Sequence, residues 1–320
     1  MPRTVHVAAP SRLHFGLWSL GGAGRQFGGV GVMVERPGLR LEIAEATRFA
    51  ARGPLADRAA AFARRWAEFQ RLSLPACEIL VREVPPEHVG LGTGTQLALA
   101  VAAGLNAWWG LPSQSPLELA ISVGRGQRSA VGTYGFAHGG LIVEQGKVAG
   151  ELVSPLDCRV SLPEDWRFVL VRPVELTGLS GDDEAHAIDA LAEIPSPIHA
   201  QLVAEAREHL VPAAATADFA DYANSLYRYG NLSGQCFAAR QGGPYNGPVL
   251  RALVERIREV GHAGVGQSSW GPTLFVVTQS QRIAEELTRR LADEDAFGAL
   301  ETLITPPCNS GARIDLANRT

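Results

Sequence analysis

A glycine-rich turn that leads straight into an apolar helix is the feature that most constrains how this chain folds. Residues 90–96 read Gly-Leu-Gly-Thr-Gly-Thr-Gln, and residues 97–108 continue as a long apolar stretch. Glycines let backbone amides turn towards a ligand, and the start of a helix carries a partial positive charge. The segment therefore predicts a phosphate-binding turn, although many glycine-rich turns before helices are only structural connections.

Two familiar nucleotide sites are excluded by the residues around this turn. The dinucleotide fingerprint needs a strand that runs directly into its glycines, whereas Pro85, Pro86 and Glu87 intervene here. The P-loop needs a lysine just after its glycines, and the only lysine in the sequence is Lys147. A bound phosphate must therefore be held by arginine side chains, backbone amides and metal.

Length and patterning indicate a globular chain of two domains. Its 320 residues suffice for two cores, and 46% of them are hydrophobic and 19% charged. Alternating residues predict strands near the N-terminus, and residues 167–171 begin a new strand after a plausible joint at residues 162–165. We expect an N-terminal domain over residues 1–163 and a C-terminal α+β domain over residues 164–320.

Several classes of function are excluded by composition. The net charge is −4 and no basic run stands out, so we expect no nucleic-acid partner. The longest apolar run, residues 97–109, is too short to span a bilayer, and the first residues lack a signal-peptide pattern. The four cysteines form no close pair, which argues against zinc and against disulfides. The expectation is a cytoplasmic protein without a membrane partner.

A polar segment near the N-terminus offers candidate phosphate ligands. Residues 9–16 read Ala-Pro-Ser-Arg-Leu-His-Phe-Gly, and in a strand Arg12 and His14 share one face while Ser11 and Leu13 share the other. Arg25 follows in a glycine-rich stretch and could close over a phosphate held by this pair. The same pattern also fits a solvated edge strand followed by a glycine loop.

Two further segments carry charge into loops. Arg125 lies between two glycines and is a candidate phosphate ligand, or a residue of an ordinary helix-to-strand turn. Asp182, Asp183 and Glu184 follow a flexible turn, as a magnesium site on a mobile loop would. Adjacent acids also occur at solvated helix starts, where the helix dipole favours them.

The turn over residues 264–273 combines glycines, hydroxyls, an amide and an indole. Ser268 and Ser269 could donate hydrogen bonds to a carboxylate or phosphate, and Trp270 could stack on an aromatic ring. So many small polar residues beside a tryptophan favour a binding turn over a mere connector.

The N-terminal strand with Ala9-Pro10, the glycine turn at residues 90–96 and the C-terminal glycine-rich turn resemble, in this order, the motifs of the GHMP kinase superfamily. Within it, residues 11–14, 24–25 with 28–29, 124–126 and 266–273 resemble the ribofuranosylaminobenzene 5'-phosphate synthases. The resemblance implies an α+β, GHMP-kinase-like two-domain fold, with a ribosomal S5 domain 2-like N-terminal domain and a ferredoxin-like C-terminal domain. It implies transfer of ribosyl 5-phosphate from phosphoribosyl pyrophosphate to 4-aminobenzoate, with loss of CO2 and pyrophosphate, Mg2+ as cofactor, and a step towards tetrahydromethanopterin.

Departures from the superfamily pattern bear on the chemistry. GHMP kinases usually have serines after the central glycines and an acidic base in the next loop, whereas residues 93–96 read Thr-Gly-Thr-Gln and residues 129–140 contain no Asp or Glu. An ATP-dependent small-molecule kinase, the alternative enzyme, is therefore disfavoured. Archaeal synthases tend to have an acid where this chain reads Leu17-Trp18-Ser19-Leu20. A catalytically inactive binding protein is the alternative outside enzymes.

The residues and the resemblance together define the expected site. Arg12, His14 and Arg25 are expected to hold the phosphoribosyl group and pyrophosphate as the catalytic set. The acceptor is 4-aminobenzoate, with 4-hydroxybenzoate left open, and a homodimer is expected because it is the commonest assembly. The expected substrate contacts are Ser11, Gly90, Gly92, Thr93, Gly94, Thr95, Gln96, Arg125, Gln267, Ser268, Ser269 and Trp270, and the expected metal ligands are Asp182, Asp183 and Glu184.

Overall fold

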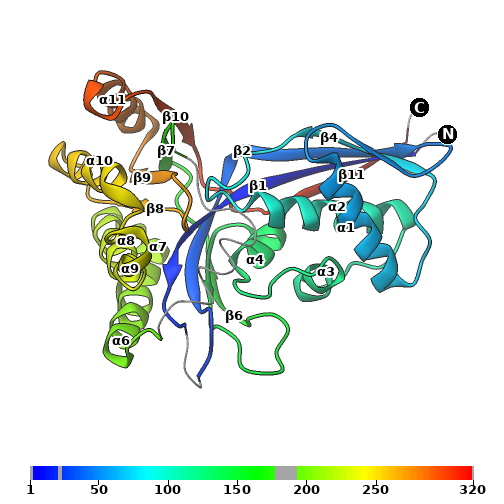
Figure 1. Ribbon diagram of the computed structural model, residues 1–320, viewed down its shortest axis with the longest axis horizontal. Helices are drawn as coiled ribbons and strands as arrows, with labels where there is room; N and C mark the ends of the chain where they lie inside the picture. The colour runs from blue at the N-terminus through cyan, green and yellow to red at the C-terminus, as the bar shows by residue number, and fades with distance from the viewer. Residues whose placement is uncertain (1–2, 21–23, 177–192, 319–320) are drawn as a thin grey trace.

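Two β-sheets with separate sets of helices make up the fold (Figure 1), as a computed structural model describes it for residues 3–20, 24–176 and 193–318. The α+β class predicted from the sequence is confirmed. The strands of the first, seven-stranded sheet are β1 (Arg3–Leu17), β2 (Gly29–Glu45), β3 (Ala50–Arg52), β4 (Cys77–Glu83), β5 (Leu141–Glu144), β6 (Leu156–Val160) and β11 (Arg313–Asn318).

The long antiparallel pair β1 and β2 is the spine of the first sheet. Its outer half carries β11 and β4 on its two sides, and its inner half carries β5 beside the start of β2. The pairing of β1 with β2 shifts register between Ala9 and Ser11, because Pro10 has no backbone N–H to donate. The two strands pair on both sides of this shift and so run through both halves of the sheet.

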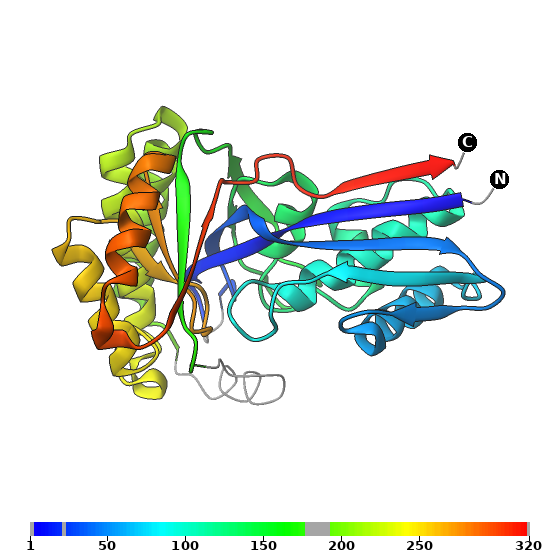
Figure 2. The same cartoon turned by 90° about the horizontal axis from the view of Figure 1, so that it is seen from above.

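Helices lie against one face of this sheet, behind its strands in the view of Figure 2. The central helix α2 is apolar on almost every side because it is enclosed by the sheet and by α1, and Leu97, Leu99 and Val101 are fully buried. The four helices are α1 (Ala56–Gln70), α2 (Thr93–Trp109), α3 (Pro116–Ser122) and α4 (Val131–His138).

The second sheet has the order β10-β7-β9-β8 and separates two layers. Alternate residues of β7 face opposite sides: Val169 and Val171 pack with α10 and α11, whereas Phe168 and Leu170 pack towards β1 and α8. The strands are β7 (Arg167–Pro173), β8 (Val265–Gln267), β9 (Leu274–Thr278) and β10 (Leu300–Thr305). The helices are α6 (Ser196–Ala204), the π-helical turn Glu205–Leu210, α7 (Val211–Thr216), α8 (Phe219–Gln235), α9 (Ala238–Gln241), α10 (Gly247–Glu259), α11 (Gln281–Ala292) and the 3-10 turn Asp295–Phe297.

One apolar core joins the two sheets. Phe15 of β1 packs against Phe275 of β9 with ring centroids 5.1 Å apart, and Phe168 of β7 lies 6.4 Å from the same ring. Residues from β1, β2, β5, β7, β9 and α8 all belong to this cluster. The two sheets are therefore held together by a shared apolar core.

The predicted domain boundary at residue 163 stays a prediction. The chain passes from the first sheet to the second between β6 and β7, close to the expected joint. Its last strand, β11, then returns to the first sheet and pairs with residues 3–8 of β1. No helix in the described segments is long and apolar enough to cross a membrane.

The shared aromatic core gives a prediction for stability. Phe275 is 1% exposed, so Phe275→Ala removes a buried ring and should lower the free energy of unfolding by about 3–5 kcal/mol. Urea denaturation followed by fluorescence measures the change. Phe69→Ala is the control, because Phe69 is 45% exposed and its loss should cost less than about 1 kcal/mol. Equal effects of the two substitutions would contradict the shared core.

Candidate active site

A cavity of about 490 Å³ lies where the first sheet, α2 and the end of α8 meet the turn before β9. Its size suits a small-molecule substrate pair. It brings together segments that are far apart in the sequence, from Arg12 in β1 to Trp270 in the C-terminal turn. The predicted residues that line it are Arg12, His14, Gly90, Gly92, Thr93, Gly94, Thr95, Arg125, Gln267, Ser269 and Trp270.

One buried hydroxyl ties three of these segments together. Ser268 Oγ accepts a hydrogen bond from the backbone N–H of His14 at 3.0 Å and donates one to the carbonyl of Gly90 at 2.6 Å. Nearby, Arg12 donates to Ser269 Oγ at 3.0 Å. The predicted role of Ser268 as a substrate ligand is therefore corrected: its hydroxyl is used within the protein, and it holds the wall of the cavity in place.

The start of α2 forms a cationic end of the cavity. A Cβ on Gly94 would lie 2.7 Å from Nη2 of Arg58 and 3.3 Å from Nη2 of Arg125, and one on Gly92 would lie 3.3 Å from Nε of Arg12. Three guanidinium groups thus gather over the N-terminal turn of the helix. Arginine forks and a helix N-terminus both favour a phosphate at this point.

The charge of the lining is strongly positive. Among the described residues that line the cavity are four arginines, including Arg58 and Arg128, and one carboxylate, Glu87, so the balance is 4 − 1 = +3 without histidines. Glu87 forms an ion pair with Arg58. Arg58 was missed by the sequence reasoning, because it lies in α1, outside every motif, and only packing brings it to the glycine turn.

Apolar side chains form the other end of the cavity. Leu17, Phe27, Phe237 and Trp270 line it and belong to one hydrophobic cluster. The rings of Phe237 and Trp270 lie 5.5 Å apart at 76°, an edge-to-face contact. This end has the apolar character that an aromatic ring needs, and the predicted stacking role of Trp270 stays a prediction.

His14 is the innermost member of a buried polar chain. Its Nε2 lies 3.2 Å from Ser129 Oγ, which donates to a carboxylate oxygen of Glu144 at 2.5 Å. The other oxygen of Glu144 accepts from the N–H of Ala130 at 2.7 Å, so the carboxylate caps α4. Burial and then the charge of Arg12 lower the pKa of His14 to about 3, so the imidazole is neutral.

Glu144 was also missed by the sequence reasoning. Residues 129–140 indeed contain no acid, but the chain returns in β5 and places Glu144, which is fully buried, against Ser129. Burial raises the pKa of Glu144 to about 7, against the opposing effect of hydrogen bonds from Ser129 and Ala130. A carboxylate ending the apolar strand Leu141–Glu144 was the signal that could have found it.

Two other predicted substrate contacts face away from the cavity and are corrected. Ser11 is fully buried and donates to the carbonyl of Pro37 at 2.6 Å, because strand alternation points it to the opposite side from Arg12. Gln96 donates to the carbonyl of Gly132 at 3.0 Å and so holds α2 against α4. Both side chains stabilise the fold around the site.

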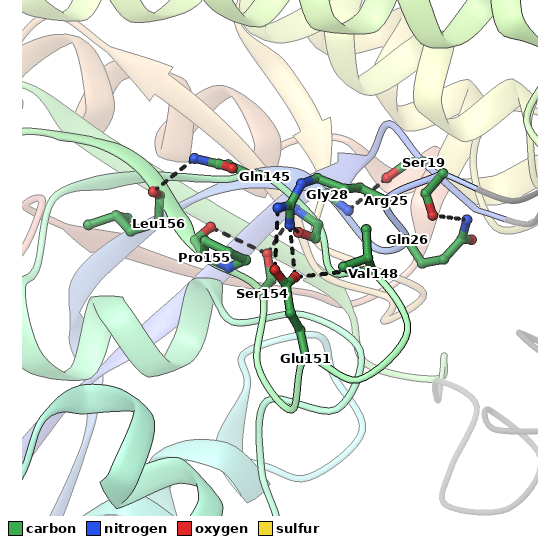
Figure 3. Close-up of polar contacts among 12 residues, drawn as sticks. Ser19, Arg25, Gln26, Gly28, Gln145, Val148, Glu151, Ser154, Pro155 and Leu156 are labelled. Carbon is green, nitrogen blue, oxygen red and sulfur yellow. Dashed lines mark hydrogen bonds and ion pairs between the residues drawn. The ribbon is translucent and has the colours of Figure 1, made fainter.

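Arg25 is absent from the described residues that line the cavity. Figure 3 shows its guanidinium against Glu151 instead. Its guanidinium donates to the carbonyl of Gly146 at 2.8 Å and to Glu151 at 2.8 and 3.3 Å. Gln26 also pairs with Lys147, so the two loops lie side by side. The structure does not bring Arg25 together with Arg12 and His14, because Glu151 offers it a charge-assisted pair. Its catalytic role stays a prediction that the geometry does not support.

The expected magnesium ligands Asp182, Asp183 and Glu184 lie outside the described residues. Within residues 3–20, 24–176 and 193–318, no group of three or more His, Cys, Asp or Glu side chains could hold a metal. Glu87, the one carboxylate among the described lining residues, is paired with Arg58. The described residues do not fit a protein-held magnesium ion by themselves, so no chemical step is assigned to one.

Comparisons with known proteins agree with this architecture. Models of the GHMP kinases N-terminal domain and of the GHMP kinases C-terminal region match residues 55–140 and 210–295. Homoserine kinase from Cytophaga hutchinsonii superposes with a TM-score of 0.66 at 16% identity, over 98% of this chain and 97% of that one. At that identity the likeness establishes the fold alone. The chain belongs to the GHMP kinase superfamily.

Sequence relatives narrow the family. Beta-ribofuranosylphenol 5'-phosphate synthase from Archaeoglobus fulgidus is 29% identical, with 98% of this chain and 100% of that protein aligned. The protein of the same name from Methanothermobacter thermautotrophicus is 28% identical over 86% of this chain and 89% of its own length. Within the superfamily, the chain is similar over nearly its whole length to the ribofuranosylphenol 5'-phosphate synthases, the group that its motifs predicted.

The cationic end gives a prediction for anion binding. Arg125→Ala removes one of the guanidinium groups at the start of α2 and should weaken pyrophosphate binding roughly 10- to 100-fold, the loss of a hydrogen bond to a charged group. Isothermal titration calorimetry measures this. Arg207→Ala, which removes a surface arginine paired with Asp157, should change nothing. A larger loss in Arg25→Ala than in Arg125→Ala would place Arg25 at the anion instead.

The buried imidazole gives a prediction for stability against pH. His14 stays neutral in the fold, whereas the unfolded chain binds its proton below the ordinary pKa of 6.5. The contribution of the neutral imidazole to the free energy of unfolding is therefore complete above pH 6.5. It is lost as the pH falls towards 3, by at most about 1.4 kcal/mol per pH unit. Urea denaturation of His14→Gln should lack this slope. The same slope in wild type and variant would show that the imidazole is hydrated.

Proposed function

We propose that this chain transfers the ribosyl 5-phosphate group of phosphoribosyl pyrophosphate to 4-aminobenzoate, with release of CO2 and pyrophosphate. The observation that carries the proposal is the division of one cavity into an arginine end at the start of α2 and an apolar end around Trp270. A phosphorylated donor and an aromatic acceptor need these two environments side by side. The product, 4-(β-D-ribofuranosyl)aminobenzene 5'-phosphate, is a precursor for tetrahydromethanopterin.

The arginine end suits the leaving group. Loss of pyrophosphate from C1 of the sugar builds positive charge on the ribosyl ring and negative charge on the departing oxygens. Arg12, Arg58 and Arg125 are held in place before the reaction, so their charges meet the pyrophosphate as that charge develops. The amides at the start of α2 add to the same field. No covalent intermediate with the protein is needed.

The apolar end suits the acceptor. The ring carbon that bears the carboxylate attacks C1, and the 4-substituent supplies electron density to the ring. The carbon–carboxylate bond then breaks, its electron pair restores aromaticity, and CO2 leaves. Phe237 and Trp270 offer an edge-to-face wall, which can flank such a ring and exclude water from the cationic sugar.

The 4-substituent of the acceptor remains part of the proposal. The name of the relatives from Archaeoglobus fulgidus and Methanothermobacter thermautotrophicus specifies a phenol product, which arises when the acceptor carries a 4-hydroxyl group. An amino group and a hydroxyl group feed the ring in the same way, so both acceptors fit the described cavity. Mg2+ bound with the pyrophosphate, a cytoplasmic location and a homodimer complete the proposal.

Release of labelled CO2 tests the proposed function. The protein is mixed with phosphoribosyl pyrophosphate, Mg2+ and carboxyl-labelled 4-aminobenzoate or 4-hydroxybenzoate, and the released CO2 is counted. We expect release that depends on the sugar donor, with the preferred acceptor giving the higher kcat/KM. A parallel reaction with ATP and small alcohols tests the kinase alternative. No release with either acceptor, or phosphorylation of an alcohol instead, would overturn the proposal.

A further inference from the structure

A buried carboxylate behind the cavity is left unused by the proposed reaction. Glu144 ends β5, is fully buried, and touches the cavity only through Ser129, which lines it. Capping α4 through Ala130 uses one of its oxygens. Its other oxygen accepts from the hydroxyl of Ser129, and Ser154 also forms a hydrogen bond with the carboxylate. Ser129 in turn contacts His14. The positions of the protons in the hydrogen bonds between Glu144, Ser129 and His14 determine which ring nitrogen of His14 carries a proton.

The hydrogen bonds of Ser129 fix the direction of the chain. Its hydroxyl proton goes to the carboxylate of Glu144, and its oxygen accepts from the N–H of Val131 at 3.3 Å. Towards His14 the oxygen can then only accept, so Nε2 of the neutral imidazole carries the proton. The other ring nitrogen, Nδ1, is left as a hydrogen-bond acceptor. It has no protein partner within the described part of the chain.

His14 lies between the two ends of the cavity. Arg12, two residues earlier on the same face of β1, belongs to the arginine end. On the other side, a Cβ on Gly29 would meet both Cε1 of His14 and Cδ2 of Leu17 at 3.4 Å, so the imidazole borders the apolar end. The group that lies between a pyrophosphate and an aromatic ring in the proposed complex is the ribosyl ring.

We propose that Glu144, acting through Ser129, is a positioning residue that keeps His14 in its Nε2–H form, so that Nδ1 accepts a hydrogen bond from the ribosyl 2-hydroxyl. The identity of the sugar rests on the proposed function. A neutral acceptor on the hydroxyl beside C1 leaves more electron density on a ring that becomes cationic, so this bond strengthens in the transition state. No proton is transferred, and His14 needs no basicity for this role.

The same chain makes the site sensitive to pH. When Glu144 is protonated it donates to Ser129, whose own proton then turns to Nε2 of His14 and forces the other tautomer. The titratable groups recorded around Glu144 are His14 of β1, Tyr134 of α4 and Tyr229 of α8, and burial raises the pKa of both phenols, which stay neutral. Since the pKa of Glu144 is about 7, kcat/KM should fall as the pH drops below that value.

Glu144→Gln tests the proposal, because it replaces one acceptor oxygen of the carboxylate with a nitrogen that donates. The N–H of Ala130 requires an oxygen, so the amide nitrogen must face Ser129 and donate to it. The proton of Ser129 then goes to His14 Nε2, and Nδ1 becomes the protonated nitrogen. Nitrogen-15 NMR of labelled histidine, recorded without substrate, should show Nε2–H in the wild type and Nδ1–H in the variant.

Binding and turnover are measured on the same proteins. The variant should bind phosphoribosyl pyrophosphate more weakly than the wild type and use it with kcat/KM reduced roughly 10- to 100-fold, without the fall below pH 7. It should also lose the preference of the wild type for phosphoribosyl pyrophosphate over its 2-deoxy counterpart. Glu205→Gln is the matched control: this carboxylate accepts from Arg228 on the helical surface, and its loss should leave tautomer and kinetics unchanged.

Each result bears on one part of the proposal. An unchanged tautomer in folded Glu144→Gln overturns it, and so does a changed tautomer with wild-type affinity for phosphoribosyl pyrophosphate. If Glu144→Gln fails to fold, Ser129→Ala replaces it and should give a mixture of the two tautomers with the same loss of affinity. Failure of the proposed transfer is seen separately, as missing CO2 release by the wild type, while the tautomer and binding measurements still report on Glu144.

Discussion

The hydroxyl of Ser268 is the constraint on which the rest of the site depends. It connects the backbone of His14 to that of Gly90, and with them the N-terminal strand, the glycine turn of α2 and the turn before β9. Ser268 is fully buried, so both hydrogen bonds are shielded from water and leaving either partner unsatisfied would be costly. The aromatic contact of Phe15 with Phe275 lies beside it and stabilises the same junction. A cavity assembled from distant segments keeps its shape through these contacts.

The electrostatic design of the cavity follows from where its charges are placed. Arg12, Arg58 and Arg125 converge on the start of α2, where a helix terminus already favours anions. Burial, and then the charge of Arg12, lower the pKa of His14 and keep its imidazole neutral. Glu144 lies behind the lining and contacts it at Ser129. Cations therefore face the ligand while the buried anion orders the side chains behind them.

Proteins with the same fold include kinases such as the homoserine kinase described above. This chain shares their architecture, and its distinguishing features are the side chains around the glycine turn. The homoserine kinase of Cytophaga hutchinsonii shares the chain path at 16% identity. In this chain the glycine turn is flanked by arginines from α1 and from the loop before α4, and an apolar slot adjoins it. A scaffold that presents a helix terminus to phosphate can thus serve a reaction in which pyrophosphate leaves from carbon, because the function lies in the site and not in the fold.

The sequence by itself determined the α+β class, the glycine turn before an apolar helix, the shared face of Arg12 and His14, and the superfamily. These features could be predicted because periodicity and local backbone conformation depend on residues that are close together in the sequence. Only the tertiary structure decided which polar residues reach the cavity. Ser11, Gln96 and Ser268 bond to the protein, Arg25 pairs with Glu151, and Arg58 and Glu144 arrive from outside every motif. Those outcomes depend on partners tens to hundreds of residues away, which no local pattern specifies.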